Sequence, residues 1–362
     1  MKKSLKRKSQ KRGAARAAAA PIQQPGKGLD VGTAFIYAAQ KAGNEVVFRV
    51  ERDAFMEIPY SDHLKTIFER DNVQYIEKDD QLYAIGNGAL RFANLFQRSV
   101  RRPMERGVMS PKEKEALPII KLIIENVLGR PRRSGEILYY SIPATPIDAD
   151  FDVLYHQRII SGFISGLGYT PKPIHEGLAV VYAELAEENF TGLGISFGGG
   201  MTNACLANLS VPVVTFSIAR GGDWIDEQVA RVINQPVSAV TAWKEAHLDL
   251  DKTENLSRIE QALSIYYDAL LDYVIGHLKQ ELGESAVHLE KPLMVVAAGG
   301  TAKPNGFLKK FQATLTRAQL PFKVEKVSLA PQLLHSVSKG ALIAAIADET
   351  KKNNPVYDAK RR

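Results

Sequence analysis

The chain has 362 residues, which is enough for two domains of ordinary size, with 45% hydrophobic and 24% charged residues. Its single cysteine, Cys205, excludes a disulfide framework and a multi-cysteine zinc site, and is typical of a reducing cytoplasm. No stretch of about 18 uninterrupted apolar residues occurs, so we expect no membrane-spanning helix and place the protein in the cytoplasm.

The net charge of +7 comes from the N-terminal end of the chain. Residues 1–20 hold eight Lys and Arg and no acid, and the remaining chain has 39 basic and 40 acidic residues. We predict that residues 1–27 form a disordered basic arm, because like charges repel and little apolar surface is available for burial. Such an arm attracts an anionic membrane, nucleic acid or an acidic protein surface, and it equally suits a solubilising tail.

Strands and helices are expected to alternate after this arm. A strand-turn-strand unit is predicted at 28–40, and strands continue over 45–58. The pattern then predicts a hairpin at 73–86, helices at 88–97 and 110–129, a strand at 136–144, and helices at 150–168 and 175–188. The helix at 110–129 carries an apparent capping box, in which Ser110 precedes Pro111 and Glu113, and Gly129 ends the apolar pattern.

A second cycle with the same opening starts at residue 191. Two or three strands with glycine turns are expected over 191–219. The pattern then predicts helices at 221–234, about 238–250 and 256–283, a strand at 292–300, a helix at 305–319, a strand at 322–329 and a closing helix at 331–350. Because the strand-turn-strand opening occurs twice, each time before alternating helices and strands, we predict two α/β halves with a cleft between them.

Three glycine-containing segments could form a nucleotide site, although each of them alone is more often a plain structural turn. "DVGT" at 30–33 places backbone N–H groups and a hydroxyl in a turn, and Asp30 at a strand end can hold a hydrated Mg²⁺. "SFGGGMTN" at 196–203 can curl around phosphate, with Thr202 as a hydroxyl donor. "AAGGTAKPNGF" at 297–307 can hold a nucleoside against the backbone.

The order and separation of these segments resemble the actin, heat-shock-chaperone and sugar-kinase superfamily, in which two phosphate loops and an adenosine loop close on ATP. Within it the chain looks most like bacterial actins of the cell-shape (MreB) type. The segments that carry this likeness are "GLDVGTA", "YAIGNGALRF" followed by "VRRPMERGVMSP", "IHEGLAVVYA" and "SIARGGDWIDEQV", while "AAGGTAKPNGF" is nearer to the form in eukaryotic actins.

This resemblance implies the actin-like ATPase fold, an α/β fold in which two duplicated domains surround a central nucleotide cleft. Domain I would span residues 28–190, with a small subdomain at about 46–105, and would end in the inter-domain helix. Domain II would span 191–345, with a small subdomain at about 224–285. Residues 346–362 would form a polar C-terminal tail.

The resemblance also implies roles for individual residues. Asp30 would hold the hydrated Mg²⁺, with Gly32 and Thr33 contacting phosphate, and Glu176 would orient the attacking water. The remaining implied positions are Gly198, Gly199, Gly200 and Thr202 around the β- and γ-phosphates, Gly221, Gly222 and Asp223 on the ribose side, and Gly299, Gly300 and Thr301 under the adenosine. Where the family has a Glu-x-x-Lys pair that grips the nucleoside, the segment "TAWKEAHLDL" offers Lys244, Glu245 and His247.

The second phosphate segment departs from the family pattern. That segment normally reads "DxGGGTT", and Ser196 stands in the place of its aspartate. A serine can hydrogen-bond a water but carries no charge, and losing such a group commonly lowers a rate by roughly 10²–10³. Phe197 and Met201 also make the loop more apolar than usual. We therefore expect nucleotide binding to survive and hydrolysis to be slow.

Two functions from different classes fit this pattern. The favoured one is a bacterial actin-like cytoskeletal protein that binds ATP, assembles head to tail with itself and hydrolyses ATP to ADP slowly. In this function the basic arm would anchor or bundle the filaments, and an unidentified cargo or adaptor would be a further partner. The alternative is a non-polymerising, nucleotide-gated assembly factor or chaperone-like module. A sugar kinase is less favoured, because no catalytic aspartate for a substrate hydroxyl is evident. ATP is preferred to GTP only through the resemblance.

Overall fold

The computed structural model describes residues 24–96, 98–110, 112–113, 115–284 and 291–352. Residues 1–23 of the predicted arm and residues 353–362 of the predicted tail lie outside these ranges. The strands are β1 (Lys27–Val31), β2 (Phe35–Ala42), β3 (Glu45–Arg52), β4 (Phe55–Pro59), β5 (Tyr75–Lys78), β6 (Gln81–Ile85), β7 (Met104–Glu105), β8 (Val108–Met109), β9 (Glu136–Ile142), β10 (Tyr169–His175), β11 (Gly192–Phe197), β12 (Thr202–Asn208), β13 (Val211–Ile218), β14 (Leu293–Ala298) and β15 (Val324–Leu329). The helices are α1 (Asp62–Arg70), α2 (Gly86–Phe96), α3 (Ala116–Leu128), α4 (Val153–Gly166), α5 (Glu176–Glu184), α6 (Gly222–Ile233), α7 (Val237–His247), α8 (Arg258–Glu284), α9 (Phe307–Ala318) and α10 (Ser336–Lys352).

Two five-stranded sheets form the framework, and they have the same topology. The first has the order β10-β9-β1-β2-β3, and the second has the order β13-β12-β11-β14-β15. In each sheet three consecutive strands form an antiparallel meander. A later strand then pairs in parallel with the first strand of the meander, and the next one pairs in parallel with that later strand. The chain therefore builds the same sheet twice, as the repeated strand-turn-strand opening predicts.

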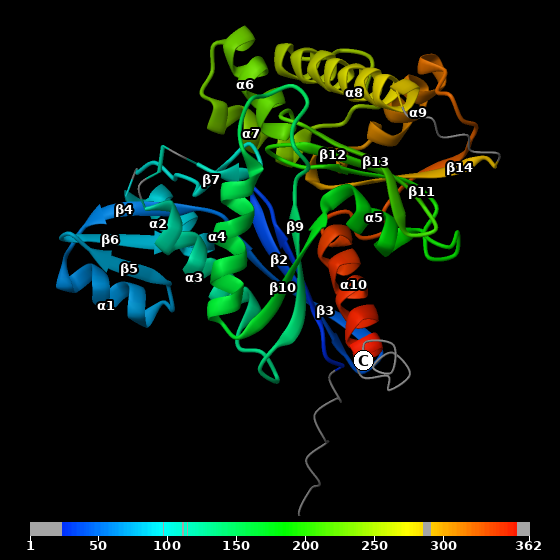
Figure 1. Ribbon diagram of the computed structural model, residues 1–362. Helices are drawn as coiled ribbons and strands as arrows, with labels where there is room; N and C mark the ends of the chain where they lie inside the picture. The colour runs from blue at the N-terminus through cyan, green and yellow to red at the C-terminus, as the bar shows by residue number, and fades with distance from the viewer. Residues whose placement is uncertain (1–23, 97, 111, 114, 285–290, 353–362) are drawn as a thin grey trace, which may run out of the picture.

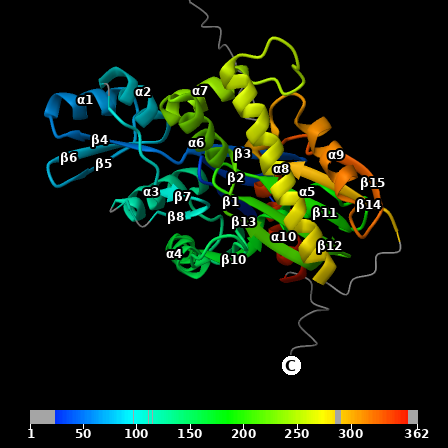
Figure 2. The same ribbon diagram turned by 90° about the horizontal axis from the view of Figure 1, so that it is seen from above.

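The helices repeat as well. α3, α4 and α5 follow β3, β9 and β10, and α8, α9 and α10 follow β13, β14 and β15. Each half also carries an insertion after its meander. In the first half this is the small β4-β6-β5 sheet with α1 and α2, which lies to one side of the molecule in both views, and in the second half it is α6 and α7 (Figures 1 and 2).

The last helix of each half packs on the sheet of the other half. α5 lies against β11 and β12, whereas α10 lies against β1 and β9, and the two helices also pack on each other (Figure 1). These contacts are so close that a Cβ added to Gly28 would lie 2.1 Å from the carbonyl oxygen of Ser338, and one added to Gly340 would lie 1.8 Å from that of Ala179. Glycine is needed at both positions because only it lets the backbones approach this closely.

Two expected boundaries are wrong at the ends of the folded part. Lys27 belongs to β1 and not to the arm, because its buried ammonium donates to the carbonyl oxygen of Leu128 at 2.6 Å and to the hydroxyl of Tyr169 at 2.7 Å. Residues 346–352 belong to α10 and not to a tail. Glu349 in this last turn is buried, and its carboxylate accepts a hydrogen bond from the backbone N–H of Ile137 at 2.8 Å.

The helix expected at 110–129 starts later, at Ala116, and Ser110 is not its N-cap. The reason is Pro118, which falls in the first turn of α3, where a missing N–H leaves no intrahelical bond unmade. A helix that began beside Ser110 would place this proline in its interior. The helix does end at the expected Gly129, where φ is +62°.

The strand β10 and the helix α1 were not predicted. Pro171 and Pro173 lie in β10 and argue against a central strand, but β10 is at the edge of its sheet, where a proline is tolerated. In the described ranges, no helix combines the length and the hydropathy that crossing a membrane requires.

Candidate functional site

A cavity of about 500 Å³ lies where the two halves meet. Its walls come from the turn after β1, the start of α5, the turn between β11 and β12, the start of α6, the end of α7 and the loop after β14. The three glycine-containing segments of the sequence therefore meet in one place, although they are separated by more than 260 residues along the chain.

Most of the predicted site residues line this cavity. Those that do are Asp30, Gly32, Thr33, Glu176, Ser196, Gly198, Gly199, Gly200, Gly222, Asp223, Lys244, Glu245, His247, Gly299, Gly300 and Thr301. Thr202 and Gly221 do not appear in its walls.

The structure contradicts the role expected for Thr202. This residue is the first of β12 and is fully buried, and its hydroxyl donates to the carbonyl oxygen of Arg220 at 2.9 Å. The hydroxyl therefore joins two backbone segments behind the loop and is not presented to a phosphate.

Gly221 supports the glycine loop from behind. A Cβ at this position would lie 2.5 Å from the carbonyl oxygens of both Gly198 and Gly199. The first N–H groups of α6 donate to the same loop, from Gly222 to Gly198 at 3.0 Å and from Asp223 to Gly199 at 2.9 Å. Gly221 is needed because the start of α6 approaches the loop this closely, and the helix holds the loop in place.

Two carboxylates face the deep end of the cavity, each paired with a serine hydroxyl. Ser141 on β9 donates to Asp30 at 2.9 Å, and Ser196 on β11 donates to Glu176 at 3.0 Å. Both carboxylates are open to the cavity but otherwise surrounded by protein, so desolvation raises the pKa of Asp30 and of Glu176, and the charge of Asp30 raises the pKa of Glu176 further. This end of the cavity therefore favours an added positive charge.

Asn203 is a further residue at this end that the sequence did not reveal. It lies on β12, lines the cavity and accepts a hydrogen bond from the hydroxyl of Ser217 at 2.5 Å. Its side-chain nitrogen is buried without a hydrogen-bond partner among the described residues. The Asn203 amide lowers the pKa of Glu176, so it lies close to that carboxylate.

At the nucleoside end of the predicted site, Lys244 pairs with an acidic residue that the sequence analysis did not name. Lys244 donates to the carboxylate of Asp226 on α6 at 2.8 Å, and Thr241, one turn before Lys244, donates to the same oxygen at 2.8 Å. Glu245 and His247 line the cavity, but the Nδ1 of His247 lies 3.2 Å from the carbonyl oxygen of Trp243. Asp226 follows Asp223 by three residues on α6, a spacing that places both on one helix face and could have been noticed in the sequence.

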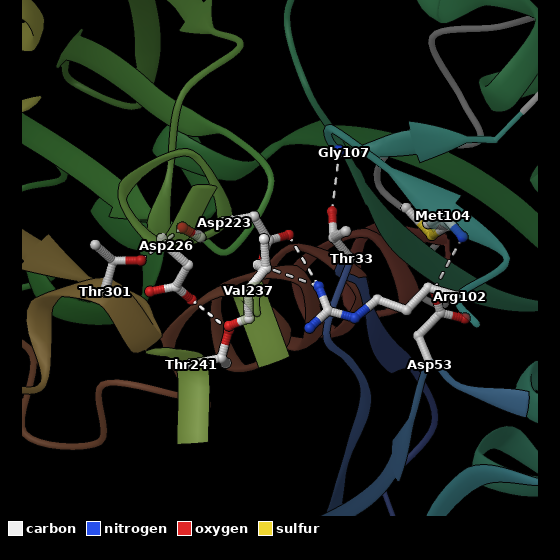
Figure 3. A network of polar contacts seen from close by, with 12 residues as sticks. Thr33, Asp53, Arg102, Met104, Gly107, Asp223, Asp226, Val237, Thr241 and Thr301 are labelled. Carbon is white, nitrogen blue, oxygen red and sulfur yellow. Dashed lines mark hydrogen bonds and ion pairs between the residues drawn. The ribbon is translucent and has the colours of Figure 1, made fainter. Parts of the chain in front are cut away.

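Contacts across the cavity join the two halves (Figure 3). Arg102, in the segment between α2 and β7, donates from Nη1 to both carboxylate oxygens of Asp223, at 3.0 and 2.9 Å. Within the first half, Gly107 donates its N–H to the hydroxyl of Thr33 at 2.9 Å. Across the cavity, the side chain of Met201 from the second half packs on Gly107.

Comparison with known proteins decides the family. The model of the Volactin family matches residues 26–345. The chain belongs to the Volactin family. No curated protein gives a significant match to it.

Solved structures share the fold of this Volactin-family chain at low sequence identity. A MamK double helical filament has a TM-score of 0.67 at 16% identity, covering 88% of this chain and 98% of the MamK chain. MreB5 of Spiroplasma citri bound to ADP has a TM-score of 0.64 at 19% identity, covering 91% and 99%. The ethanolamine utilization protein EutJ from Carboxydothermus hydrogenoformans has a TM-score of 0.52 at 15% identity, covering 90% of each chain. The fold is that of the actin-like ATPases, as the sequence predicts.

The glycine loop of this Volactin-family chain differs from the "DxGGGTT" pattern at two positions that face the cavity. Ser196 replaces the aspartate, and Met201 replaces the first threonine. Ser196 is 3% exposed, with its hydroxyl committed to Glu176, and Met201 is 2% exposed. The glycines that would cradle phosphate are retained, whereas one charge and one hydroxyl at the cavity wall are absent.

Proposed function

We propose that this chain is an actin-like cytoskeletal protein that binds ATP with Mg²⁺ in the cavity, assembles head to tail into filaments and hydrolyses the nucleotide slowly. The observation that carries the proposal is the meeting of the three glycine-containing segments in one cavity of about 500 Å³ between duplicated halves. This volume is within the ordinary range for small-molecule and cofactor sites.

The placement of the nucleotide follows from the chemistry of the cavity walls. Gly198, Gly199 and Gly200 offer backbone that can approach phosphates closely. Lys244, held by Asp226, and the loop from Gly299 to Thr301 line the cavity beside the glycine loop and suit a nucleoside. Structural neighbours bound to ADP or AMPPNP, MreB5 of Spiroplasma citri among them, support this reading.

The residues at the deep end fit a hydrated Mg²⁺. Asp30 and Glu176 have hydroxyl groups as hydrogen-bond partners, and no lysine or arginine ion pair is recorded for either in the described part of the chain. Oxygen ligands of this kind are the ones Mg²⁺ prefers, and Asp30 would hold the ion through its water shell. When bound, the ion would neutralise charge on the phosphates. Glu176, oriented by Ser196, would position the attacking water.

Slow hydrolysis follows from the two changes in the glycine loop. Phosphoryl transfer depends on positioning and charge neutralisation and needs little covalent chemistry from the protein. Ser196 supplies a hydroxyl in place of a charge, and Met201 supplies no hydrogen bond to a water. Filaments of this protein would therefore be long-lived, because hydrolysis would seldom loosen them.

Assembly into filaments is supported by the structural neighbours and by the geometry of head-to-tail contacts. MamK has been solved as a double helical filament, and this chain spans 98% of its length at a TM-score of 0.67. A heterologous contact that does not close on itself extends without limit.

The alternative is a nucleotide-gated assembly factor that does not polymerise, and the changed glycine loop favours it because such a factor can act without rapid hydrolysis. Electron microscopy of the full-length protein with ATP, with ADP and without nucleotide separates the two. Filaments that require nucleotide support the proposal. Nucleotide binding without filaments under any of these conditions would exclude polymerisation and leave the alternative, while the absence of nucleotide binding would exclude both.

A further inference from the structure

Arg102 forms an ion pair that bridges the two halves beside the glycine loop (Figure 3). It comes from the segment between α2 and β7, whereas its partner Asp223 lies in the first turn of α6. The side chains of Arg102 and Asp223 are 34% and 32% exposed, so the pair is only partly shielded from water. Such an ion pair is sensitive to any further charge placed in the cavity.

The charges that line the cavity make Arg102 distinctive. The acidic lining residues outnumber the basic ones, and they are Asp30, Glu176, Asp223, Asp226 and Glu245. The basic lining residues in the described part of the chain are Arg102, Lys244 and Lys303. Lys244 is paired with Asp226 on the nucleoside side, and Lys303 follows the loop after β14. Arg102 is therefore the basic lining side chain that pairs with the carboxylate bordering the glycine loop.

The carboxylate of Asp223 lies beside the glycine loop, so phosphate bound there would need a neighbouring cation. A Cβ added to Gly199 would lie 3.7 and 3.8 Å from its two carboxylate oxygens, so the carboxylate borders the glycine loop. A polyphosphate held by this loop would meet the negative charge of Asp223 unless a neighbouring cation neutralised it. Arg102 already contacts both oxygens of that carboxylate.

The segment that carries Arg102 is hydrogen-bonded to the first half and is in contact with the glycine loop of the second half. The N–H of Met104 donates to the buried carboxylate of Asp53 at 3.2 Å, and the N–H of Gly107 donates to Thr33. A Cβ added to Gly200 would lie 2.7 Å from the nitrogen of Gly107, so the glycine loop touches this segment directly. Arg102 is thus presented from a positioned backbone.

Both recorded bonds of Arg102 to Asp223 come from Nη1. The guanidinium group has five N–H donors in a planar fork that suits phosphate oxygens, so Nη2 and Nε can serve a second anion while Nη1 keeps the first. We propose that Arg102 binds the terminal phosphate of a nucleoside triphosphate and, by keeping its contact with Asp223, makes closure of the cleft depend on that phosphate. This inference rests on the proposed nucleotide binding and adds a residue that distinguishes the triphosphate from the diphosphate.

The test compares the affinities of the full-length protein for AMPPNP and ADP, both with Mg²⁺, by calorimetry. We expect Arg102→Gln to weaken AMPPNP binding roughly 10- to 100-fold and ADP binding less than about 3-fold, because the lost hydrogen bonds to charged oxygens serve only the terminal phosphate. Arg102→Lys should lose less, since the charge remains. Arg101→Gln is the matched control, because Arg101 pairs with Glu57 and does not line the cavity.

Asp223→Asn separates phosphate binding from closure. It should leave AMPPNP affinity equal to or above that of the wild type, because a negative charge beside the phosphates is removed. Hydrogen exchange in the segment 102–107 should then be faster in the AMPPNP-bound variant than in the AMPPNP-bound wild type, because the bridge is weaker.

Four results would overturn the inference. For Arg102→Gln, they are an equal loss of affinity for AMPPNP and ADP, and no loss of affinity for either nucleotide. For Asp223→Asn, they are a large loss of affinity for AMPPNP, and hydrogen exchange in segment 102–107 that is unchanged from the wild type. Each of them leaves the proposed function standing. Wild-type protein that binds neither nucleotide would instead overturn the proposed function, and this inference with it. Thermal melting of the variants without nucleotide shows whether each one is folded.

Discussion

Restoring the missing carboxylate is the most direct perturbation of the glycine loop. Ser196 is buried at the cavity wall, with its hydroxyl 3.0 Å from the carboxylate of Glu176. The variant Ser196→Asp places a third carboxylate beside Glu176 and Asp30. The site then gains the charge that the "DxGGGTT" pattern has at this position.

Two effects of opposite sign are expected. Without a cation, two carboxylates about 4 Å apart repel by about 4 kcal/mol at an effective dielectric constant of 20, so the free variant should be less stable than the wild type. With Mg²⁺ and ATP, the added carboxylate helps to position the attacking water. The rate of phosphate release should then rise by roughly 10²–10³, the reverse of the usual loss when such a group is removed.

The assay is phosphate release in a single turnover with saturating ATP and Mg²⁺, together with thermal melting with and without Mg²⁺. Ser196→Asn is the control, because it has nearly the same size as aspartate and no charge. Wild-type protein that already hydrolyses ATP as fast as Ser196→Asp would refute the reasoning. So would an equal acceleration in Ser196→Asn, because charge would then not be the cause.

Two further predictions concern stability. Gly340→Ala should lower the unfolding free energy by roughly 3 kcal/mol or more, because its Cβ would lie 1.8 Å from the carbonyl oxygen of Ala179. Gly162→Ala on α4 is the control, since its Cβ meets open space and the change should be neutral or slightly stabilising. Equal melting temperatures for the two variants would contradict the packing described here. Burial raises the pKa of Asp53 from 3.8 to about 8, so its folded form holds a proton that the unfolded form loses, and stability should fall as the pH rises from about 4 to about 8. Asp53→Asn should therefore become more stable relative to the wild type across that window in melting experiments, and a difference that does not change with pH would refute the assignment.

The fold could be predicted because its signals are local and occur twice. The turn at Gly32 and the turn at Gly198 each follow a short apolar strand, and each is followed by a return strand, so both meanders were visible in the sequence. The residues that meet in the cavity could be named because they lie in turns at strand ends, and the likeness to actin-like ATPases supplied their grouping.

The errors arose where long-range contacts decide the outcome. The sequence shows that Thr202 comes after three glycines and Met201, but only the tertiary structure directs its hydroxyl to the carbonyl of Arg220. Likewise, Asp226 pairs with Lys244 across two helices, and no spacing along one helix could reveal this. Arg102 was part of a quoted motif, yet its partner lies 121 residues further along the chain.

The exchange of helices between the halves bears on how the chain is made. The sheet of the first half is complete at His175, but α10, which packs on β1 and β9, is formed by residues 336–352 at the other end of the folded chain. A ribosome that has released the first half has therefore not yet supplied the helix that covers this face. Domains commonly fold in the order of their synthesis, but here the first half stays unfinished until the last helix emerges. We therefore expect the two halves to reach their native state together, and separate expression of either one to leave an apolar sheet face uncovered.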